Sequence, residues 1–552
     1  MHTYSRRRVL QAVAALAGAG ALPPSLFAQT ERTPTLLEVA RLAGESITAR
    51  LDRERGFQPY FHLDITSDPP EGLHSSWDYV DTAGRFVAAF LALRELGLQV
   101  DREAEAGVRR FFLANQGEDG LFYDQQSEWS ERAAESFAQS RAMAALVELA
   151  LAGDREAEQR IDRHIAALVR ISEPLGDGLG LPGRRYRDGW LDRSLTALGA
   201  DDRIAKPGYA ALVAEPLIRY AAAAGHHGAL SLASSLIRGF FAAGAIRDDG
   251  RFIGHTHSWG ILPVTIALVE LGSLTGDREL IEFARLVFDV VVSEGTPWGW
   301  IPDGIGFASG YPGGWFCETC GLADAIVLGI RLGQLGHERA WSDVERFVRN
   351  QLIANQLREV DRVLPLERAA QSRTNAAAIL RGSFEAWARP NSLLGGLDLL
   401  EHGGLEACCT GSAVMAIREV ARAAAVLRDG TLWIDLPLTL RTSLAEIESS
   451  EPRDGVLMVT PHISGPIAIR LPSGAEPASV DVDGVPAAFE FRTGTLFLAG
   501  VPGRRRVVVR YPLVEREERQ VAGGLAVTAR WRGATVVAID PPGERYPIFR
   551  NR

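Results

Sequence analysis

All four cysteines of the chain lie in two short stretches, and each stretch stands at the start of an apolar run. The first stretch is Cys317-Glu318-Thr319-Cys320 and the second is Cys408-Cys409. Proteins hold a soft metal ion with thiolates brought together from separate elements. Zinc takes four ligands in a tetrahedron, drawn from cysteine sulfur, histidine nitrogen and carboxylate oxygen. The sorting of the cysteines therefore favours a zinc site.

The two stretches offer three sulfurs and one carboxylate to a single ion. Glu318 and Cys320 are two residues apart at the entry to a predicted helix, so both can face one ion. Cys408 and Cys409 are adjacent and poorly placed to form a disulfide with each other. With zinc bound, the site carries a net charge of about −2 and its thiols stay deprotonated. Such a site is structural or presents a nucleophilic sulfur. A Cys320–Cys408 disulfide and four inert buried thiols are the alternatives.

The order Glu-x-Cys followed by Cys-Cys resembles the motifs of a known family. Glu318-x-Cys320 and the run Cys408-Cys409-Thr410-Gly411 are similar to those of glycoside hydrolase family 127, the zinc-thiolate β-L-arabinofuranosidases. Residues 301–306, Ile-Pro-Asp-Gly-Ile-Gly, resemble the family's Gly-Ile-Gly loop. The resemblance implies an (α/α)6 barrel with β-rich accessory domains. It also implies that Glu318, Cys320, Cys408 and Cys409 bind zinc and that Cys408 is the nucleophile.

The chain departs from the family pattern at the catalytic acid/base. The family carries this glutamate between the Gly-Ile-Gly loop and the Glu-x-Cys motif, but residues 307–316 contain no carboxylate. Asp303, Glu385 and Asp78 are our candidates for the missing acid. Such an acid must reach the glycosidic oxygen and needs a pKa raised by a partly apolar pocket.

Apolar runs alternate with amphipathic segments between about Leu36 and Leu427, which we expect to be helical throughout. Runs that are apolar all round the helix are buried, and amphipathic helices cover them. Six such pairs predict an (α/α)6 toroid, in which the loops that lead the inner helices meet at one rim. The predicted inner helices are Gly84–Leu96, Ala142–Leu151, Ala210–Ala224, Ile261–Leu274, Leu322–Leu335 and Ala413–Leu427.

From Gly430 onwards the composition changes to short β-rich runs. Turn signals such as Asp454-Gly455 and Asp483-Gly484 separate them. Many short strands broken by turns are typical of a β-sandwich. We therefore predict a catalytic barrel over residues 29–429 and an accessory β-sandwich over residues 430–552.

Tryptophans and histidines gather in the loops near the predicted rim. Indole rings stack on the C–H faces of sugars and donate a hydrogen bond to their hydroxyls, although core packing is the alternative for any one ring. The family places a histidine in a similar loop for substrate binding, so the resemblance implies sugar contact for His255 and His257. A second metal is disfavoured because no carboxylate stands at ligand spacing, and a structural role is the other alternative. The predicted substrate-binding residues are Trp77, Asp78, His255, His257, Trp300 and Trp315.

The length, charge and hydropathy of the chain limit its domain number and its binding partners. Its 552 residues suffice for two or three domains, and a net charge of −10 without a basic patch argues against nucleic acid. No segment after residue 28 approaches the roughly 18 uninterrupted apolar residues of a membrane span.

The N-terminus resembles a targeting segment. Arg6-Arg7-Arg8 precede an apolar run from Val13 to Leu22, which resembles a twin-arginine export signal cleaved near Ala28. A Sec signal with several arginines is the alternative. We expect a periplasmic or secreted protein.

These observations predict an exported zinc-dependent glycoside hydrolase with a carbohydrate substrate. The alternatives are an (α/α)6 polysaccharide lyase or unsaturated-uronyl hydrolase with structural zinc, and a non-catalytic carbohydrate-binding relative. The short segment before Cys317, which lacks the acid, favours these alternatives more than any other feature.

Overall fold

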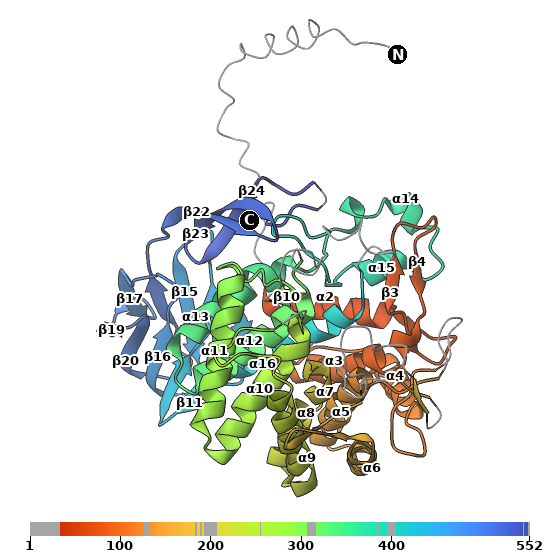
Figure 1. Cartoon of the computed structure of the whole chain (residues 1–552). Coiled ribbons are helices and arrows are strands. Elements are labelled where there is room, and N and C mark those ends of the chain that lie inside the picture. The colour runs from red at the N-terminus through yellow and green to blue at the C-terminus, as the bar shows by residue number, and fades with distance from the viewer. Residues whose placement is uncertain are drawn as a thin grey trace, which may run out of the picture.

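The chain folds into a helical part followed by a β-sheet part, which occupy different sides of the molecule in Figure 1. The computed structural model describes residues 34–125, 132–182, 185–187, 190–192, 207–253, 256–305, 316–384, 386–394, 405–544 and 546–549, with backbone alone at 185–187, 190–192, 207, 256 and 259.

A closed ring of helices forms the centre of the helical part. Each ring helix contacts the next one along the ring, and α16 contacts α3, so the ring closes on itself. Most residues of α3 and α12 are buried, as their apolar composition predicted. The ring helices are α3 (Asp81–Glu95), α5 (Ser136–Leu151), α8 (Ala214–Ala224), α10 (Ser258–Thr275), α12 (Thr319–Gln334) and α16 (Cys408–Ala424).

Each ring helix packs against an amphipathic outer helix. Three outer helices begin at an aspartate, Asp101, Asp154 or Asp277, whose carboxylate accepts hydrogen bonds from backbone N–H groups of the first turn. Gly225 and Gly276 end α8 and α10 in the left-handed conformation, as expected for helix stop signals. The outer helices are α2 (Leu36–Ala49), α4 (Arg102–Ala114), α6 (Arg155–Ile171), α9 (His227–Ala242), α11 (Arg278–Glu294) and α13 (Glu338–Phe347).

The expectation of helix throughout residues 36–427 was wrong. The predicted run Ala210–Ala224 is split into α7 (Pro207–Ala211) and α8, and the last run stops at Ala424. Short antiparallel strand pairs interrupt the helices because backbone pairing, which local periodicity does not report, holds them. They are β1 (Leu51–Asp52) with β2 (Gln58–Pro59), β3 (His62–Asp64) with β4 (Glu71–Leu73), β5 (Glu173–Leu175) with β6 (Gly178–Gly180), β7 (Arg185–Arg187) with β8 (Trp190–Asp192), and β9 (Thr256–His257) with β10 (Gly304–Ile305).

The segment between α13 and α16 is also largely non-helical where it is described. Its short elements are the π-helical turn η3 (Val348–Leu352), the 3-10 turn η4 (Val360–Arg362), α14 (Leu366–Ala369) and α15 (Ala376–Leu380). A similar 3-10 turn, η1 (Ser76–Asp78), leads α3. Of these elements, α14 and α15 lie above the ring helices in Figure 1.

Two sheets of the β part share one hydrophobic core. Buried and exposed residues alternate along β15, so Leu457 and Val459 point inward. One sheet has the order β11-β12-β16-β20-β19 and the other β13-β14-β15-β21-β17-β18. Their strands are β11 (Ala425–Arg428), β12 (Thr431–Ile434), β13 (Leu440–Arg441), β14 (Ala445–Ser449), β15 (Val456–Pro461), β16 (Gly465–Arg470), β17 (Ser479–Val482), β18 (Val485–Pro486), β19 (Glu490–Arg492), β20 (Thr495–Val501) and β21 (Val507–Arg510).

A third sheet, β22 (Glu515–Ala522), β23 (Leu525–Arg532) and β24 (Thr535–Asp540), is tied to the helical part. The side chain of Asn350 in η3 donates to the carbonyl of Ala534 and accepts from the N–H of Val536. Both bonds are buried, so the helical and sheet parts share a fixed contact.

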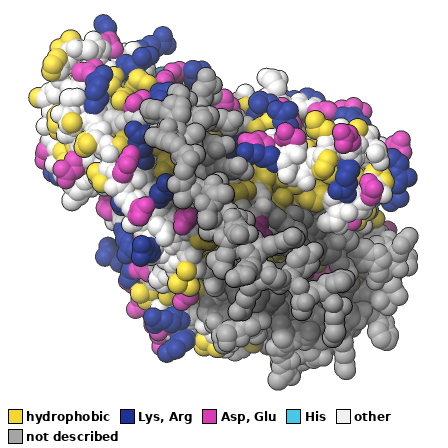
Figure 2. Space-filling view, turned by 90° about the horizontal axis from the view of Figure 1, so that it is seen from above, with side chains coloured by type: hydrophobic (Ala, Val, Ile, Leu, Met, Phe, Trp, Pro, Cys, Tyr) yellow, Lys and Arg dark blue, Asp and Glu magenta, His cyan; other side chains and the backbone are white. Residues whose placement is uncertain are grey.

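Two further features concern the length of the helices and the charge of the surface. No helix in the described part of the chain is both long and apolar enough to cross a bilayer. On the described part of the face in Figure 2, basic and acidic side chains are interspersed.

Candidate metal centre and active site

Glu318, Cys320, Cys408 and Cys409 come together where two neighbouring ring helices begin. Glu318 is the N-cap residue of α12, and Cys320 lies in its first turn. Cys408 and Cys409 are the first two residues of α16, which packs against α12. The four potential ligand atoms all lie within 4.8 Å of one another, and all four residues are buried. The structure thus brings the sequence-predicted set to one place.

The spacing of this cluster suits a tetrahedral ion. The Sγ atoms of Cys320 and Cys409 are 3.6 Å apart, whereas two sulfurs on one zinc at 2.3 Å each are separated by about 3.8 Å. The Sγ of Cys409 lies 3.9 Å from Oε1 of Glu318. The buried Oε2 of Glu318 has no hydrogen-bond partner among the described residues. The residues present therefore fit a zinc ion.

The cysteines do not form the alternative disulfide. All four are free thiols in the structure. Cys317 stands apart from the cluster, because its backbone N–H donates to the carbonyl of Ala388 (2.8 Å) and its side chain is buried elsewhere. Burial raises the pKa of the Cys317 thiol to about 12. Cys317 thus lies outside the group of potential metal ligands that contains the other three cysteines.

Electrostatics favour a thiolate within the cluster. Burial opposes ionisation of Cys320, but hydrogen bonds from the thiols of Cys408 and Cys409 and the charge of Arg85 lower its pKa well below the ordinary value. Burial and the negative charge of Cys320 raise the pKa of Glu318 well above its usual range. The N-termini of α12 and α16 also point their positive dipole ends at the sulfurs. The site is therefore built to hold negative charge that a cation would compensate.

His257 belongs to a second group of potential ligands that shares Glu318. The pairing of β9 with β10 places His257 opposite Gly304, next to Asp303. Nδ1 of His257 lies 2.8 Å from Oδ1 of Asp303, and Nε2 lies 3.6 Å from Oε2 of Glu318. The expectation that no carboxylate stands at ligand spacing from His257 was therefore wrong. The pairing of β9 with β10, which are far apart in the chain, supplies it.

Three predicted catalytic or substrate-binding residues are buried. Asp303 is 0% exposed and faces His257 and Ser258, so it positions the imidazole, and its role as an acid stays a prediction. Asp78, also 0% exposed, accepts hydrogen bonds from Gln58, Phe61, His74 and Ser75. Trp300 is 1% exposed, and its indole N–H donates to the carbonyl of Ala388.

Of the other predicted site residues, one is described and three lie outside the described residues. Trp77 is half-buried and packs against Phe61 and Phe137. His255, Trp315 and Glu385 lie outside the described residues. Sugar contact by Trp77, His255 and Trp315 stays a prediction, as does the role of Glu385 as an acid.

Glu406 is a functional candidate that sequence reasoning missed. Its Oε2 lies 3.9 Å from the Sγ of Cys408, and its side chain is half-buried. Burial, and then the negative charge of Cys320, raise the pKa of Glu406 to about 7. The available signal was a carboxylate two residues before the cysteine pair. Asp303, Glu385 and Asp78 were predicted as the acid instead.

A distant backbone pairing holds Glu406 in place. Residue 406 forms an antiparallel bridge with His62, and the N–H of Ala407 donates to the carbonyl of Phe61 (2.8 Å). The buried guanidinium of Arg50 donates to the carbonyls of Phe61 and Leu405 and so joins the two segments. The carboxyl beside Cys408 is therefore fixed by residues more than 300 positions away.

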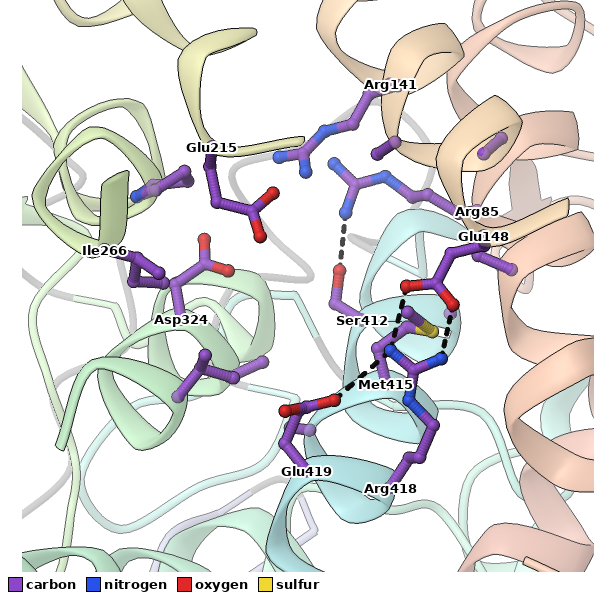
Figure 3. A pocket seen from close by; sticks show the side chains of 18 of the residues that line it. Arg85, Arg141, Glu148, Glu215, Ile266, Asp324, Ser412, Met415, Arg418 and Glu419 are labelled. Atoms are coloured by element: carbon purple, nitrogen blue, oxygen red, sulfur yellow. Dashed lines mark hydrogen bonds and ion pairs between the residues drawn. The ribbon is translucent and has the colours of Figure 1, made fainter. Parts of the chain in front are cut away.

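A charged cavity lies along the ring and adjoins the cysteine cluster through Arg85 (Figure 3). All ring helices line it. Arg418 pairs with Glu148, and the carboxylates of Glu215 and Asp324 both point into the cavity. Burial raises the pKa of Asp324 to about 7, whereas the charges of Arg219 and Arg418 overcome burial and lower the pKa of Glu148 to about 2.

Comparison with known proteins finds similar structures but no similar sequences. No protein-family model matches the chain, and no curated protein matches its sequence. Solved structures do match. The fold is similar to that of glycoside hydrolase family 127. A β-L-arabinofuranosidase of that family from Geobacillus stearothermophilus T6 shares 15% identity at a TM-score of 0.56, over 91% of this chain and 80% of the other.

Two further structures show how widely the fold is shared. A second β-arabinofuranosidase of family 127 gives a TM-score of 0.57 at 16% identity, covering 92% of this chain and 81% of its own. A sugar epimerase from a ruminal bacterium gives 0.50 at 14% identity, covering 69% of this chain and 98% of its own. The resemblance to family 127 is confirmed at the level of the fold. Identities this low carry no activity by themselves, so the function depends on the residues of the site.

Proposed function

We propose that this chain is an exported, zinc-dependent, retaining glycoside hydrolase that acts on a β-L-arabinofuranoside-like substrate. The observation that carries the proposal is the pairing of Cys408 with Glu406 beside a buried set of metal-ligating side chains. A nucleophile and a carboxylic acid in contact are the two groups that a retaining glycosidase needs. The likeness in fold to β-L-arabinofuranosidases supports the choice of sugar.

Glu318, Cys320, Cys408 and Cys409 would hold the zinc ion. When bound, zinc would keep the thiolates charged at neutral pH and neutralise part of their charge. The chain's own residues account for the remaining chemistry. His257, held by Asp303, lies against Glu318 and limits the orientations that this carboxylate can take.

The proposed reaction is a double displacement at the anomeric carbon. The Cys408 thiolate attacks this carbon and forms a C–S bond while the glycosidic C–O bond breaks and Glu406 protonates the departing oxygen. In the second step the Glu406 carboxylate takes a proton from water. The resulting hydroxide attacks the anomeric carbon, the C–S bond breaks, and the Cys408 thiolate is released. The two inversions retain the configuration of the sugar.

The finer architecture is part of the proposal. We assign the helical part as an (α/α)6 toroid, since the ring helices and their outer partners alternate along the chain. We assign the region after residue 429 an accessory role. We also propose export by the twin-arginine route, on the basis of Arg6-Arg7 and the apolar run that follows. That route carries folded proteins, so the thiols would meet their metal before reaching an oxidising compartment.

A panel of aryl glycosides tests the proposal. The purified protein, loaded with zinc, should release the aryl group from an aryl β-L-arabinofuranoside, and prior treatment with a thiol-compatible chelator should abolish this activity. Product analysis by NMR should show retained anomeric configuration. Zinc-loaded protein that cleaves no glycoside but acts on an unsaturated uronyl oligosaccharide would support the rival enzyme class instead.

A further inference from the structure

Arg85 joins the cysteine cluster to the charged cavity. It lies in α3, and its side chain is 8% exposed. Its Nη1 lies 3.6 Å from the Sγ of Cys320 on α12 and also donates to the hydroxyl of Ser412 on α16. Its Nε donates to Oδ1 of Asp81, at 2.7 Å. Figure 3 shows the hydrogen bond from the guanidinium to Ser412 on the neighbouring helix α16.

The buried guanidinium of Arg85 is therefore a permanently charged hydrogen-bond donor to the sulfur of Cys320. An arginine stays protonated in proteins, so its charge does not depend on the state of the cluster. Three thiolates and a carboxylate around a divalent cation carry a net charge of about −2. Buried charge is costly unless it is paired, and hydrogen bonds that involve charged groups are the stronger ones.

The three sulfurs of the cluster therefore have different neighbours. Cys320 receives the guanidinium N–H of Arg85. Cys409 lies between Cys320 and Glu318. Cys408 faces the carboxyl of Glu406. A donated hydrogen bond draws electron density from the sulfur that accepts it, which lowers both the basicity and the nucleophilicity of that sulfur.

We propose that Arg85 is a positioning residue that fixes Cys320 as a permanent metal ligand and leaves Cys408 as the more reactive sulfur. The inference rests on the proposed metal site and adds a role for a residue outside the ligand set. The charged hydrogen bond from the guanidinium holds the Cys320 thiolate in place, so the metal leaves this sulfur less easily. It also holds α3, α12 and α16 in register around the site, through Asp81, Cys320 and Ser412.

Cobalt is a suitable probe, because thiolate-to-Co²⁺ charge-transfer bands report on the sulfur donors directly. The full mature chain would be loaded with Co²⁺ in place of zinc. Spectra would be recorded for wild type, Arg85→Gln and Arg85→Lys while the pH is lowered. Arg331→Gln is the matched control, because it also removes a cavity arginine, whose partners are Glu270 and Glu419 and not a cysteine.

The expected result is a change confined to the Arg85 variants. Arg85→Gln should shift the charge-transfer band to lower energy, weaken Co²⁺ binding by about tenfold to hundredfold, and release the metal at higher pH than wild type. Arg85→Lys keeps the charge but loses the planar fork, so its shifts should be smaller and in the same direction. Arg331→Gln should leave the band and the pH of release unchanged.

Three outcomes would overturn the inference, and one of them also overturns the proposed function. If wild type forms no thiolate–Co²⁺ band, both the metal site and the role of Arg85 fail. If wild type forms the band and Arg85→Gln matches Arg331→Gln, only the role of Arg85 fails. Should Arg85→Gln not fold, the lysine variant decides, and a band and release pH identical to wild type would refute the inference.

Discussion

Oε2 of Glu406 lies 3.9 Å from Sγ of Cys408, with a single residue between the two at the start of α16. The contact places a carboxyl group beside the sulfur that we assign as the nucleophile. Because Cys408 begins the helix, its backbone is fixed by α16, whereas Glu406 is fixed by pairing with residues 61–63. Two independent elements thus set the distance between acid and nucleophile.

Replacing Glu406 with Gln should remove the proton donor and keep the shape of the site. We expect kcat/KM on a glycoside with a poor leaving group to fall by about 10²–10⁴, with a much smaller loss on a dinitrophenyl glycoside, which departs without protonation. Steady-state kinetics on both substrates is the measurement. Glu448→Gln, an exposed change on β14, is the control. Equal losses on the two substrates would assign the proton to another group, and Glu385 would be the next candidate.

Cys408→Ser and Cys409→Ser should differ although both residues are ligand candidates. Cys408→Ser should abolish turnover and keep much of the zinc, since three ligands remain and water can fill the fourth position. Cys409→Ser should mainly weaken zinc binding and lower the melting temperature, because a structural ligand contributes folding energy. Zinc content by elemental analysis, melting temperature and rate would be measured for both. Substantial activity in Cys408→Ser would show that this sulfur is not the nucleophile.

Arg50→Met should displace the Glu406 carboxyl group and leave zinc binding unchanged. Arg50 is 0% exposed and holds the segment before Glu406 against Phe61. We expect kcat to fall at least tenfold while zinc content stays near that of wild type. Comparing these two quantities in one preparation is the measurement. A variant that loses zinc and activity together would mean that Arg50 supports the whole site.

The pair Arg418–Glu148 should matter for stability far more than the nearby pair Arg422–Glu95. The side chains of the first pair are 3% and 6% exposed, and those of the second 47% and 43%. Breaking a buried pair costs about 3–5 kcal/mol, whereas an exposed pair contributes about 0–1 kcal/mol. Chemical denaturation of Arg418→Met and Arg422→Met compares the two. Similar losses of unfolding free energy in both variants would contradict this prediction.

The buried pair Arg418–Glu148 also predicts how stability changes as the pH falls. The pKa of Glu148 is lowered from its ordinary 4.5 to about 2, so its contribution to stability is present above pH 4.5 and is lost as the pH falls towards 2. Glu148→Gln should therefore flatten the dependence of melting temperature on pH in this window. An unchanged slope would place the acid sensitivity elsewhere.

Changing Arg6-Arg7 to Lys-Lys should block export and leave folded protein in the cytosol. The twin-arginine pair precedes a modest apolar run, and the receptor of that route reads the arginines themselves. Cell fractionation with a zinc assay of both fractions is the measurement. Undiminished periplasmic protein would argue for the Sec route.

The ring helices and the cysteine cluster were predictable from sequence. The apolar runs that became α3, α5, α10 and α12 carry their own periodicity and stop signals, so local physics decides them. The cysteines were predictable for a different reason. They are so few that their position at the start of two apolar runs marked the cluster before any fold was known.

Only the tertiary structure decided which acids lie at the site. Asp303 meets His257 because β9 pairs with β10, and Glu406 meets Cys408 because residues 405–407 pair with residues 61–63. Burial of Asp78 and Trp300 likewise depends on distant partners. Helical periodicity is a property of neighbours in the chain, whereas strand pairing and burial depend on which remote segments meet. The potential metal ligands could therefore be read from the chain, whereas the carboxyl group beside Cys408 could not.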